Sequence, residues 1–299
     1  MNFKLLKLNL GSGDRADKKW RDVPSQYTAA EPGLLIILLD QSGSMKNGWG
    51  ALSDKRIDRA TTYVNEMIDR VVADSRAGNI REEQIFVAVF GYSRKKEGDR
   101  PDQVCRLLVD GWPAKLLQEQ ENALARERPL IEPYAYGETP YVTAFHTALS
   151  YIKQFLSKPD LKDRFRRSAP PVILNITDGE ADEATAGNVD EGRLEDLKDV
   201  IHEIRNLETP SGFPPLVFHV QIASKDTQSV VLPSTDKSLD EHGKLLFSLA
   251  SAIPSRWVQA LKGRFDPPLQ PGAVGLMMNA GPGDLWNFLR LASRPHARD

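Results

Sequence analysis

The sequence of 299 residues contains a single cysteine, Cys105, and no long hydrophobic run. One cysteine excludes an intrachain disulfide and every paired-cysteine zinc or redox motif, so a reducing compartment is expected. The longest apolar run, Gly33–Leu39, is far shorter than the roughly 20 residues of a bilayer-spanning helix. Lysines interrupt the first ten residues and no small-residue cleavage site follows them, which argues against a signal peptide. We therefore predict a cytoplasmic protein that has no membrane as a partner.

The chain also lacks an excess of charge of one sign. It carries 39 Lys and Arg against 41 Asp and Glu, a net charge of −2 with histidine neutral. This balance excludes a globally basic nucleic-acid binder and leaves room only for a local patch, so nucleic acid is not expected as a partner. Charged residues at 27% and hydrophobic residues at 40% are ordinary for a globular protein.

Short apolar runs alternate with amphipathic helical segments along the chain. Residues 34–39 (LLIILL) are typical of a strand that is buried on both faces. Residues 53–76 then place apolar side chains at spacings of three and four, as on one face of a helix. Further strands are predicted at 84–90, 104–109, 171–177, 216–222 and 273–278, and further helices at 114–128, 143–156, 194–207, 242–251 and 284–291. The alternation predicts an α/β fold with a mostly parallel sheet of about six strands and helices on both faces.

The same pattern suggests how the chain is divided. Residues 1–29 show little periodicity and are interpreted as an N-terminal arm, whereas 30–295 are expected to form one α/β domain. Two stretches, 94–133 and 225–270, are predicted to be insertions in this domain.

Hydroxyl and carboxylate side chains follow two of the predicted strands and precede one of the predicted helices. Asp40, Ser42 and Ser44 follow the first strand, Thr139 precedes the helix at 143–156, and Asp178 follows the strand at 171–177. Ligands of open parallel sheets bind beyond the carboxyl ends of the strands. Oxygen ligands without imidazole or sulfur suit Mg²⁺, or Mn²⁺ or Ca²⁺. We therefore predict a divalent metal site formed by these five residues.

Three separate motifs carry a resemblance to a known family. Asp40–Ser44 (DQSGS) resembles the Asp-x-Ser-x-Ser signature of the von Willebrand factor A (VWA) family. Thr139 stands where that family has its metal-site threonine, and Asp178, in a Thr-Asp-Gly triplet, matches its second aspartate. Asn65 and Asn175 also match family positions.

The resemblance implies a Rossmann-like VWA fold with a metal-ion-dependent adhesion site. In that family both serines bind the ion directly, the threonine binds directly or through water, and the aspartates often bind through water. A Glu or Asp of a partner protein completes the shell. The run 273–291 is similar to bacterial cytoplasmic members, including tellurium-resistance-associated ones. The resemblance thus implies an adaptor in a stress-response complex, with an AAA+ ATPase or a kinase–phosphatase pair as partner.

Two alternatives compete with this non-enzymatic interpretation. A Mg²⁺-dependent phosphohydrolase would need a general base, for which Glu138, Glu180 and Asp182 are the nearby candidates. A metal-free VWA scaffold would bind through another face, such as that of the 94–133 insertion. Within the metal site Thr143 competes with Thr139, and Thr139 is preferred because Thr143 should lie inside the following helix.

Overall fold

The computed structural model describes most of the chain outside the two termini. The described residues are 20, 22–24, 27–49, 54–77, 83–95, 99–179, 184–185, 188–189, 191–222, 228–260 and 268–293. Most of the predicted arm, 1–29, lies outside the described residues. The same holds for Glu180 and Asp182, the two candidate bases that follow Asp178.

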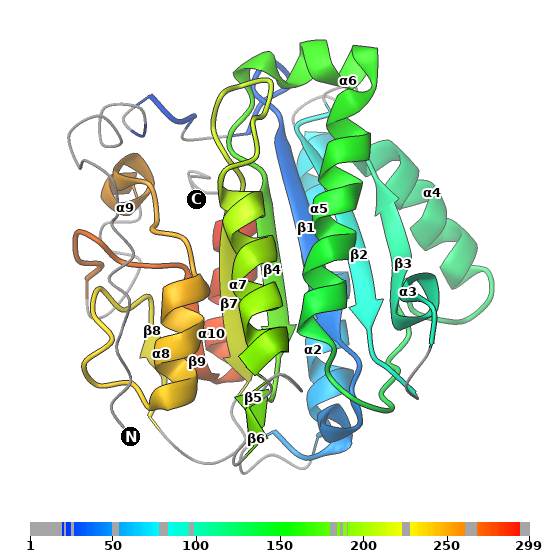
Figure 1. The fold of residues 1–299 in the computed structure, drawn as a ribbon. Coiled ribbons are helices and arrows are strands. Elements are labelled where there is room, and N and C mark those ends of the chain that lie inside the picture. Colours follow the sequence, from blue (N-terminus) through cyan, green and yellow to red (C-terminus); the bar gives the residue numbers. More distant parts are fainter. Residues whose placement is uncertain are drawn as a thin grey trace.

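A seven-stranded sheet runs through the centre of the molecule (Figure 1). Its strands, in spatial order, are β3 (Cys105–Gly111), β2 (Ile85–Tyr92), β1 (Gly33–Asp40), β4 (Val172–Thr177), β7 (Leu216–Ile222), β9 (Leu276–Ala280) and β8 (Val230–Val231). Strands β3 and β8 are antiparallel to their neighbours, and the other pairs are parallel. The predicted α/β class and mostly parallel sheet are confirmed. The strand beyond the expected six is β8, whose two residues are too few to show a hydrophobic period.

The order of the first six strands places the topological switch point of the sheet. Counted along the chain, these strands lie in the order 3-2-1-4-5-6, which is that of a doubly wound α/β sheet. The connections run outward in opposite directions from β1 and β4, and the carboxyl ends of two such strands are where ligands of doubly wound sheets bind. A separate two-stranded ribbon, β5 (Ala184–Thr185) and β6 (Asn188–Val189), follows β4 in the chain.

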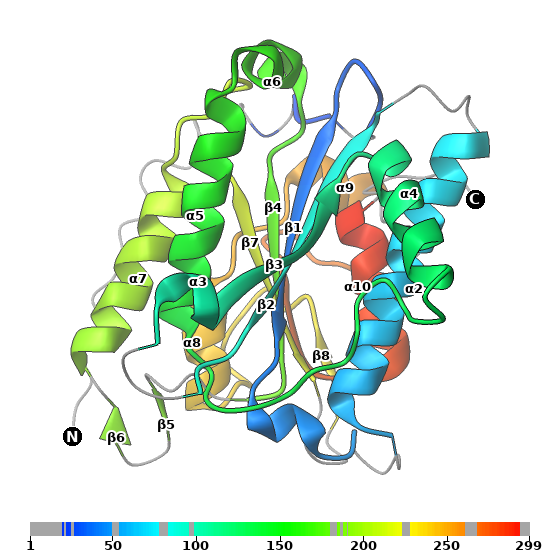
Figure 2. The ribbon, with the colours of Figure 1, turned by 90° about the vertical axis from the view of Figure 1, so that its right-hand side faces the viewer.

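Two layers of helices cover the sheet (Figure 2). One face carries α2 (Arg56–Ala77), α4 (Pro113–Leu124) and α10 (Pro282–Ser293), and the other α5 (Tyr141–Ser157), α7 (Glu191–Arg205) and α8 (Glu241–Leu249). The short helices are η1 (Gly43–Lys46), α3 (Pro101–Val104), α6 (Pro159–Arg164), η2 (Phe165–Arg167) and α9 (Ser255–Ala260). In the described part of the chain no helix has the length and hydrophobicity to cross a membrane.

The burial of strand β1 on both faces explains why its sequence is apolar without interruption. Alternate side chains enter different cores: Leu35, Ile37 and Leu39 pack on the side of α2, and Leu34, Ile36 and Leu38 on the side of α5. All six are fully buried. Burial of an aliphatic side chain contributes about 1.5–3 kcal/mol, so both faces of β1 stabilise the sheet whose end presents the candidate site.

The described end of the N-terminal arm packs against the domain. Val23 and Tyr27 are buried, and the Trp257 indole donates a hydrogen bond to the Pro24 carbonyl at 3.0 Å. Of the predicted insertions, 94–133 supplies β3 and α4, and 225–270 supplies β8, α8 and α9. The domain boundaries themselves stay a prediction.

Candidate metal centre

The predicted ligands lie at the carboxyl ends of β1 and β4, which are neighbours at the switch point of the sheet. Asp40 is the last residue of β1, and Asp178 directly follows β4. The Gly43 amide donates to the Gly137 carbonyl at 2.8 Å, which joins the serine loop to the segment before α5. Three segments that are distant in sequence therefore meet here, at the lower end of the sheet in Figure 1.

Asp40 is fully buried, and both of its carboxylate oxygens accept hydrogen bonds. Oδ1 accepts from the Ser42 amide at 2.7 Å, and Oδ2 accepts from the Thr177 hydroxyl at 2.6 Å. Burial, and then the nearby charge of Asp178, raise the pKa of Asp40 to about 7 against the lowering effect of these bonds. Thr177 was given no role by the sequence reasoning, although it stands in the Thr-Asp-Gly triplet.

Asp178 is also held by two protein donors. Its Oδ1 accepts from the Ser44 hydroxyl at 2.7 Å, and its Oδ2 accepts from the guanidinium of Arg56. Arg56 begins α2 and also donates through Nε to the Gly48 carbonyl at 3.0 Å. An arginine head group in place of the cation would have excluded a metal site, but this guanidinium contacts the oxygen that does not face Ser44. No pattern in the sequence indicates this role of Arg56.

The two serine hydroxyls are adjacent, with their oxygens 3.0 Å apart. A hydroxyl has one proton and two lone pairs. Because Ser44 donates its proton to Asp178, the Ser42 hydroxyl is the donor of the Ser42–Ser44 bond. Ser42 is buried whereas Ser44 is exposed, so the centre opens to solvent at Ser44.

This donor set fits a small, hard cation. Neighbouring oxygens of a Mg²⁺ octahedron with bonds of 2.0–2.1 Å are about 2.9 Å apart, close to the 3.0 Å between the two serine oxygens. Protein donors occupy the carboxylates, so the hydroxyl lone pairs are the groups that remain for direct contact. In the described parts of the chain, no cluster of three or more His, Cys, Asp or Glu offers a metal site built from those side chains alone.

Thr139 lies between two residues that are tied to the centre. Gly137 contacts the serine loop, and the Tyr141 hydroxyl donates at 3.0 Å to the carbonyl of Gly179, the residue after Asp178. Thr139 itself is buried. Thr143 lies inside α5, as expected. The structure thus brings the three predicted segments together, while the assignment of Thr139 as a ligand stays a prediction.

The two asparagines of the resemblance form hydrogen bonds with other parts of the fold. Asn65 in α2 exchanges two hydrogen bonds of 3.0 Å with the backbone of Ile131, which fixes the segment that leads to Thr139. Asn175 is buried in β4, where its Oδ1 accepts from the Tyr92 hydroxyl at 2.8 Å. Both asparagines therefore accept a hydrogen bond through Oδ1, while the buried Nδ2 of Asn175 has no partner among the described residues.

Gln41 links the centre to its surroundings, which the sequence reasoning did not anticipate. Its carbonyl accepts from the Tyr136 amide at 2.6 Å, and its side-chain Oε1 accepts from Arg106 at 3.3 Å. Gly91 in β2 makes this possible, because a Cβ there would lie 2.2 Å from Gln41 Oε1. A glycine within an apolar strand is a sequence signal for such a close approach.

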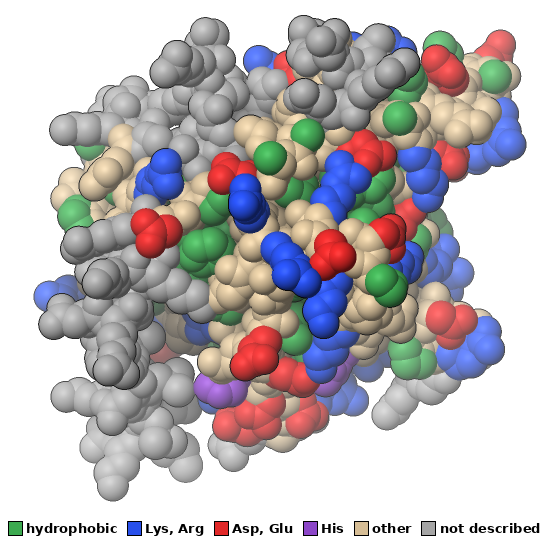
Figure 3. Space-filling model, turned by 90° about the horizontal axis from the view of Figure 1, so that it is seen from above, with side chains coloured by type: hydrophobic (Ala, Val, Ile, Leu, Met, Phe, Trp, Pro, Cys, Tyr) green, Lys and Arg blue, Asp and Glu red, His purple; other side chains and the backbone are tan. Residues whose placement is uncertain are grey.

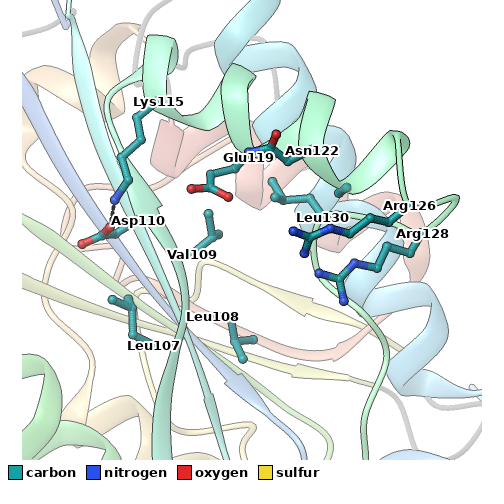
Figure 4. Close-up of a pocket in the computed structure, with 11 residues that line it drawn as sticks. Leu107, Leu108, Val109, Asp110, Lys115, Glu119, Asn122, Arg126, Arg128 and Leu130 are labelled. Carbon is teal, nitrogen blue, oxygen red and sulfur yellow. Dashed lines mark hydrogen bonds and ion pairs between the residues drawn. The ribbon is translucent and has the colours of Figure 1, made fainter.

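A pocket of about 300 Å³ lies elsewhere, between β3 and α4 (Figure 4). Lys115 forms an ion pair with Asp110 at one end at 2.6 Å, and Arg126 and Arg128 lie side by side at the other. Its lining includes none of the five predicted metal ligands.

Comparisons with known proteins give no family match: no protein-family model matches the chain, and no curated protein matches its sequence. The chain is similar to a solved structure of the pilus adhesin SpaC from Lactobacillus rhamnosus GG (12% identity, 90% of this chain, 30% of that one, TM-score 0.48). It is also similar to the vWF domain of the type V pili tip protein Mfa5 from Porphyromonas gingivalis (15%, 51% and 39%, 0.32). A third is the manganese-loaded TRAP protein of Plasmodium vivax (12%, 67% and 60%, 0.35). The chain thus spans less than two thirds of each of these structures, and none of them assigns a function to it.

Proposed function

We propose that this chain is a protein-interaction module that binds a divalent cation and captures an acidic side chain of a partner. Ser42, Ser44 and Thr139 would hold the cation, while Asp178 orients the Ser44 hydroxyl and Asp40 holds the backbone amide of Ser42. The observation that carries the proposal is that the carboxylates and the hydroxyls of the centre have different partners. Protein donors occupy both carboxylates, while two hydroxyl oxygens lie 3.0 Å apart at an opening to solvent.

The charges at the centre explain why a partner carboxylate would be attracted. Asp40 and Asp178 contribute two negative charges when ionised, and Arg56 one positive charge. The centre thus has one net negative charge, and with a divalent cation the net charge is one positive. Neutral hydroxyls leave the charge of a bound cation poorly compensated, so a Glu or Asp side chain at the exposed opening is strongly favoured.

Mg²⁺ is the cation that we propose first, with Mn²⁺ and Ca²⁺ as alternatives. From the resemblance alone, we also infer a bacterial cytoplasmic setting and a stress-response complex that contains an AAA+ ATPase or a kinase–phosphatase pair. A phosphohydrolase gains no specific support, because Glu138, its one described candidate base, is exposed and paired with Arg94 at 2.9 Å.

Thermal unfolding and calorimetry with added MgCl₂, MnCl₂ and CaCl₂ test the cation site. A cation that binds only the folded state raises the melting temperature as its concentration increases. We expect this rise in the wild type and its loss in Ser44→Ala. The matched control is Ser157→Ala, which removes a surface hydroxyl that caps its own helix and should leave the rise intact. Absence of a rise with all three cations in the wild type would reject the metal site.

A further inference from the structure

Four basic side chains and two tyrosines form a surface beside the candidate metal centre. We call this surface the cationic–tyrosine rim, and its members are Lys46, Arg94, Lys95, Arg106, Tyr134 and Tyr136. Lys46 Nζ lies 5.4 Å from the centroid of the Tyr136 ring. Lys95 Nζ and Arg106 Cζ lie 5.7 and 5.1 Å from the centroid of the Tyr134 ring.

The rim lies beside the metal centre, to which hydrogen bonds and the short helix η1 join it. Gln41, between Asp40 and Ser42, accepts hydrogen bonds from the Tyr136 amide and the Arg106 guanidinium. Lys46 belongs to η1, the same short helix as Ser44. A partner that places a carboxylate at Ser44 therefore meets the rim with its neighbouring residues.

Three of the four basic side chains of the rim form no ion pair among the described residues, although the Asp99 carboxylate accepts from the backbone amide of Lys95 at 3.0 Å. Arg94 has a carboxylate partner, Glu138. Lys46, Lys95 and Arg106 have no ion-pair partner within the described parts of the chain. All three are exposed. Since the whole chain has a net charge of −2, this excess is local.

The opposite end of the sheet has a different charge pattern. Seen from above, acidic and basic side chains are interspersed on that face (Figure 3). Helix α6 lies at this end (Figure 1). There Arg164 pairs with Glu83, and Arg166 pairs with Asp163 at 2.9 Å. Two of the arginines at that end are thus paired with neighbouring carboxylates, and acidic side chains stand among the basic ones.

We propose that the cationic–tyrosine rim docks an acidic segment of the protein partner. This inference rests on the proposed function, because one carboxylate of the segment would reach the cation while flanking carboxylates contact Lys95 and Arg106. The positive charge of the rim identifies an acidic segment as its occupant. Complementary charges also speed association and disfavour wrong partners.

The tyrosines make the rim suited to a protein chain rather than to a free ion. Tyr136 is 50% exposed, and cation–π contacts hold Lys46 and Arg106 over ring faces before a partner arrives. Tyrosine and arginine are enriched at protein interfaces because they offer contact area and polar groups together. Groups that are already ordered lose less conformational entropy on binding.

Fluorescence anisotropy with a labelled peptide of alternating glutamate and glycine tests the rim on the full chain with MgCl₂. We expect Arg106→Glu, and separately Lys95→Glu, to weaken binding roughly tenfold or more, because each replaces an attraction between close opposite charges by a repulsion. Arg126→Glu makes the same change of charge at the pocket of Figure 4 and should leave binding within about twofold of wild type. The same peptide with glutamine in place of glutamate should not bind.

The outcomes separate the rim from the cation site. Equal losses in Arg106→Glu and Arg126→Glu would overturn the inference, because binding would then follow net charge alone. Tighter binding of a DNA duplex than of the peptide would also overturn it. If EDTA abolishes binding while Arg106→Glu and Lys95→Glu bind normally, the rim is wrong and the cation site stands. If both rim variants lose binding and EDTA has no effect, the rim stands and the proposed cation bridge fails.

Discussion

The guanidinium of Arg56 and the carboxylate of Asp178 form a buried ion pair that joins the first residue of α2 to the end of β4. Their side chains are 8% and 0% exposed. The pair neutralises Asp178 and leaves its other oxygen on the Ser44 hydroxyl. Arg56 therefore positions an aspartate behind the candidate ligand and keeps its charge from cancelling that of a bound cation.

Breaking this ion pair on one side should destabilise the protein strongly. Removal of one partner leaves a buried charge without compensation, which costs about 3–5 kcal/mol. We expect Arg56→Met and Asp178→Asn each to lower the free energy of unfolding in urea by this amount. The double variant should lose less than the sum, because it leaves no unpaired charge. The control is Arg59→Met, whose exposed pair with Asp54 contributes little; a loss in Arg56→Met no larger than this control's would contradict the prediction.

The contrast between what the sequence predicted and what it missed follows from distance along the chain. Strands β1 and β4 are uninterrupted apolar runs and helix α2 has an apolar face in its own sequence, so the fold class and the positions of Asp40 and Asp178 were predictable. Arg56 contacts Asp178 across 122 positions, and Thr177 contacts Asp40 across 137. No local pattern tells which side chains of a first helical turn or a strand end will meet. These contacts between residues distant in sequence can be recognised only once the strands are placed side by side in the structure.

Asp40→Asn should stabilise the metal-free protein at alkaline pH. The pKa of Asp40 is about 7 in the folded state against 3.8 ordinarily, so ionised Asp40 opposes folding. Its cost grows by about 1.4 kcal/mol per pH unit between these values and is then constant. Asparagine removes this charge, and its amide can accept from the Ser42 amide and face the Thr177 hydroxyl. We expect a higher free energy of unfolding than wild type at pH 8 in EDTA.

The same variant should no longer be stabilised by Mg²⁺, because the site has lost the negative charge of the Asp40 carboxylate. Chemical unfolding at pH 8, with EDTA and then with MgCl₂, measures both effects on one sample. A variant that is less stable than wild type in EDTA would show that its hydrogen bonds outweigh the buried charge. A buried charge that is kept for ligand binding at the expense of stability is common at functional sites.

Gly137 should resist replacement more than another glycine with the same backbone conformation. Gly137 has φ +80°, and a Cβ there would lie 2.1 Å from the Arg94 carbonyl oxygen. Gly212 has φ +76° and nothing within 4 Å of its Cβ position. Alanine at either site carries left-handed strain of about 1–2 kcal/mol, but only Gly137→Ala must also displace backbone. We expect Gly137→Ala to lose more stability in urea and to weaken Mg²⁺ binding by calorimetry. Equal losses of stability in the two variants would show that the backbone at Arg94 moves away from the new Cβ at no cost in free energy.

His219 should make the protein sensitive to mild acid. The side chain is fully buried in β7 against the ring of Phe145, and neither ring nitrogen has a hydrogen-bond partner among the described residues. Burial, followed by the charges of Arg205 and His242, lowers the pKa of His219 from 6.5 to about 3. The unfolded chain therefore takes up a proton below pH 6.5 that the folded chain accepts only near pH 3.

Stability should thus fall as the pH drops from 6.5 towards 3, by about 1.4 kcal/mol per unit from this residue. His219→Leu puts an apolar side chain of similar size in this position and removes the proton uptake. The difference in unfolding free energy between this variant and wild type should grow in favour of the variant with each step from pH 6 to pH 4. His202→Gln, at an exposed position of α7, serves as the reference and should follow the wild-type curve. Parallel curves for His219→Leu and wild type would mean that water or a structural rearrangement lets the buried imidazole charge at little cost.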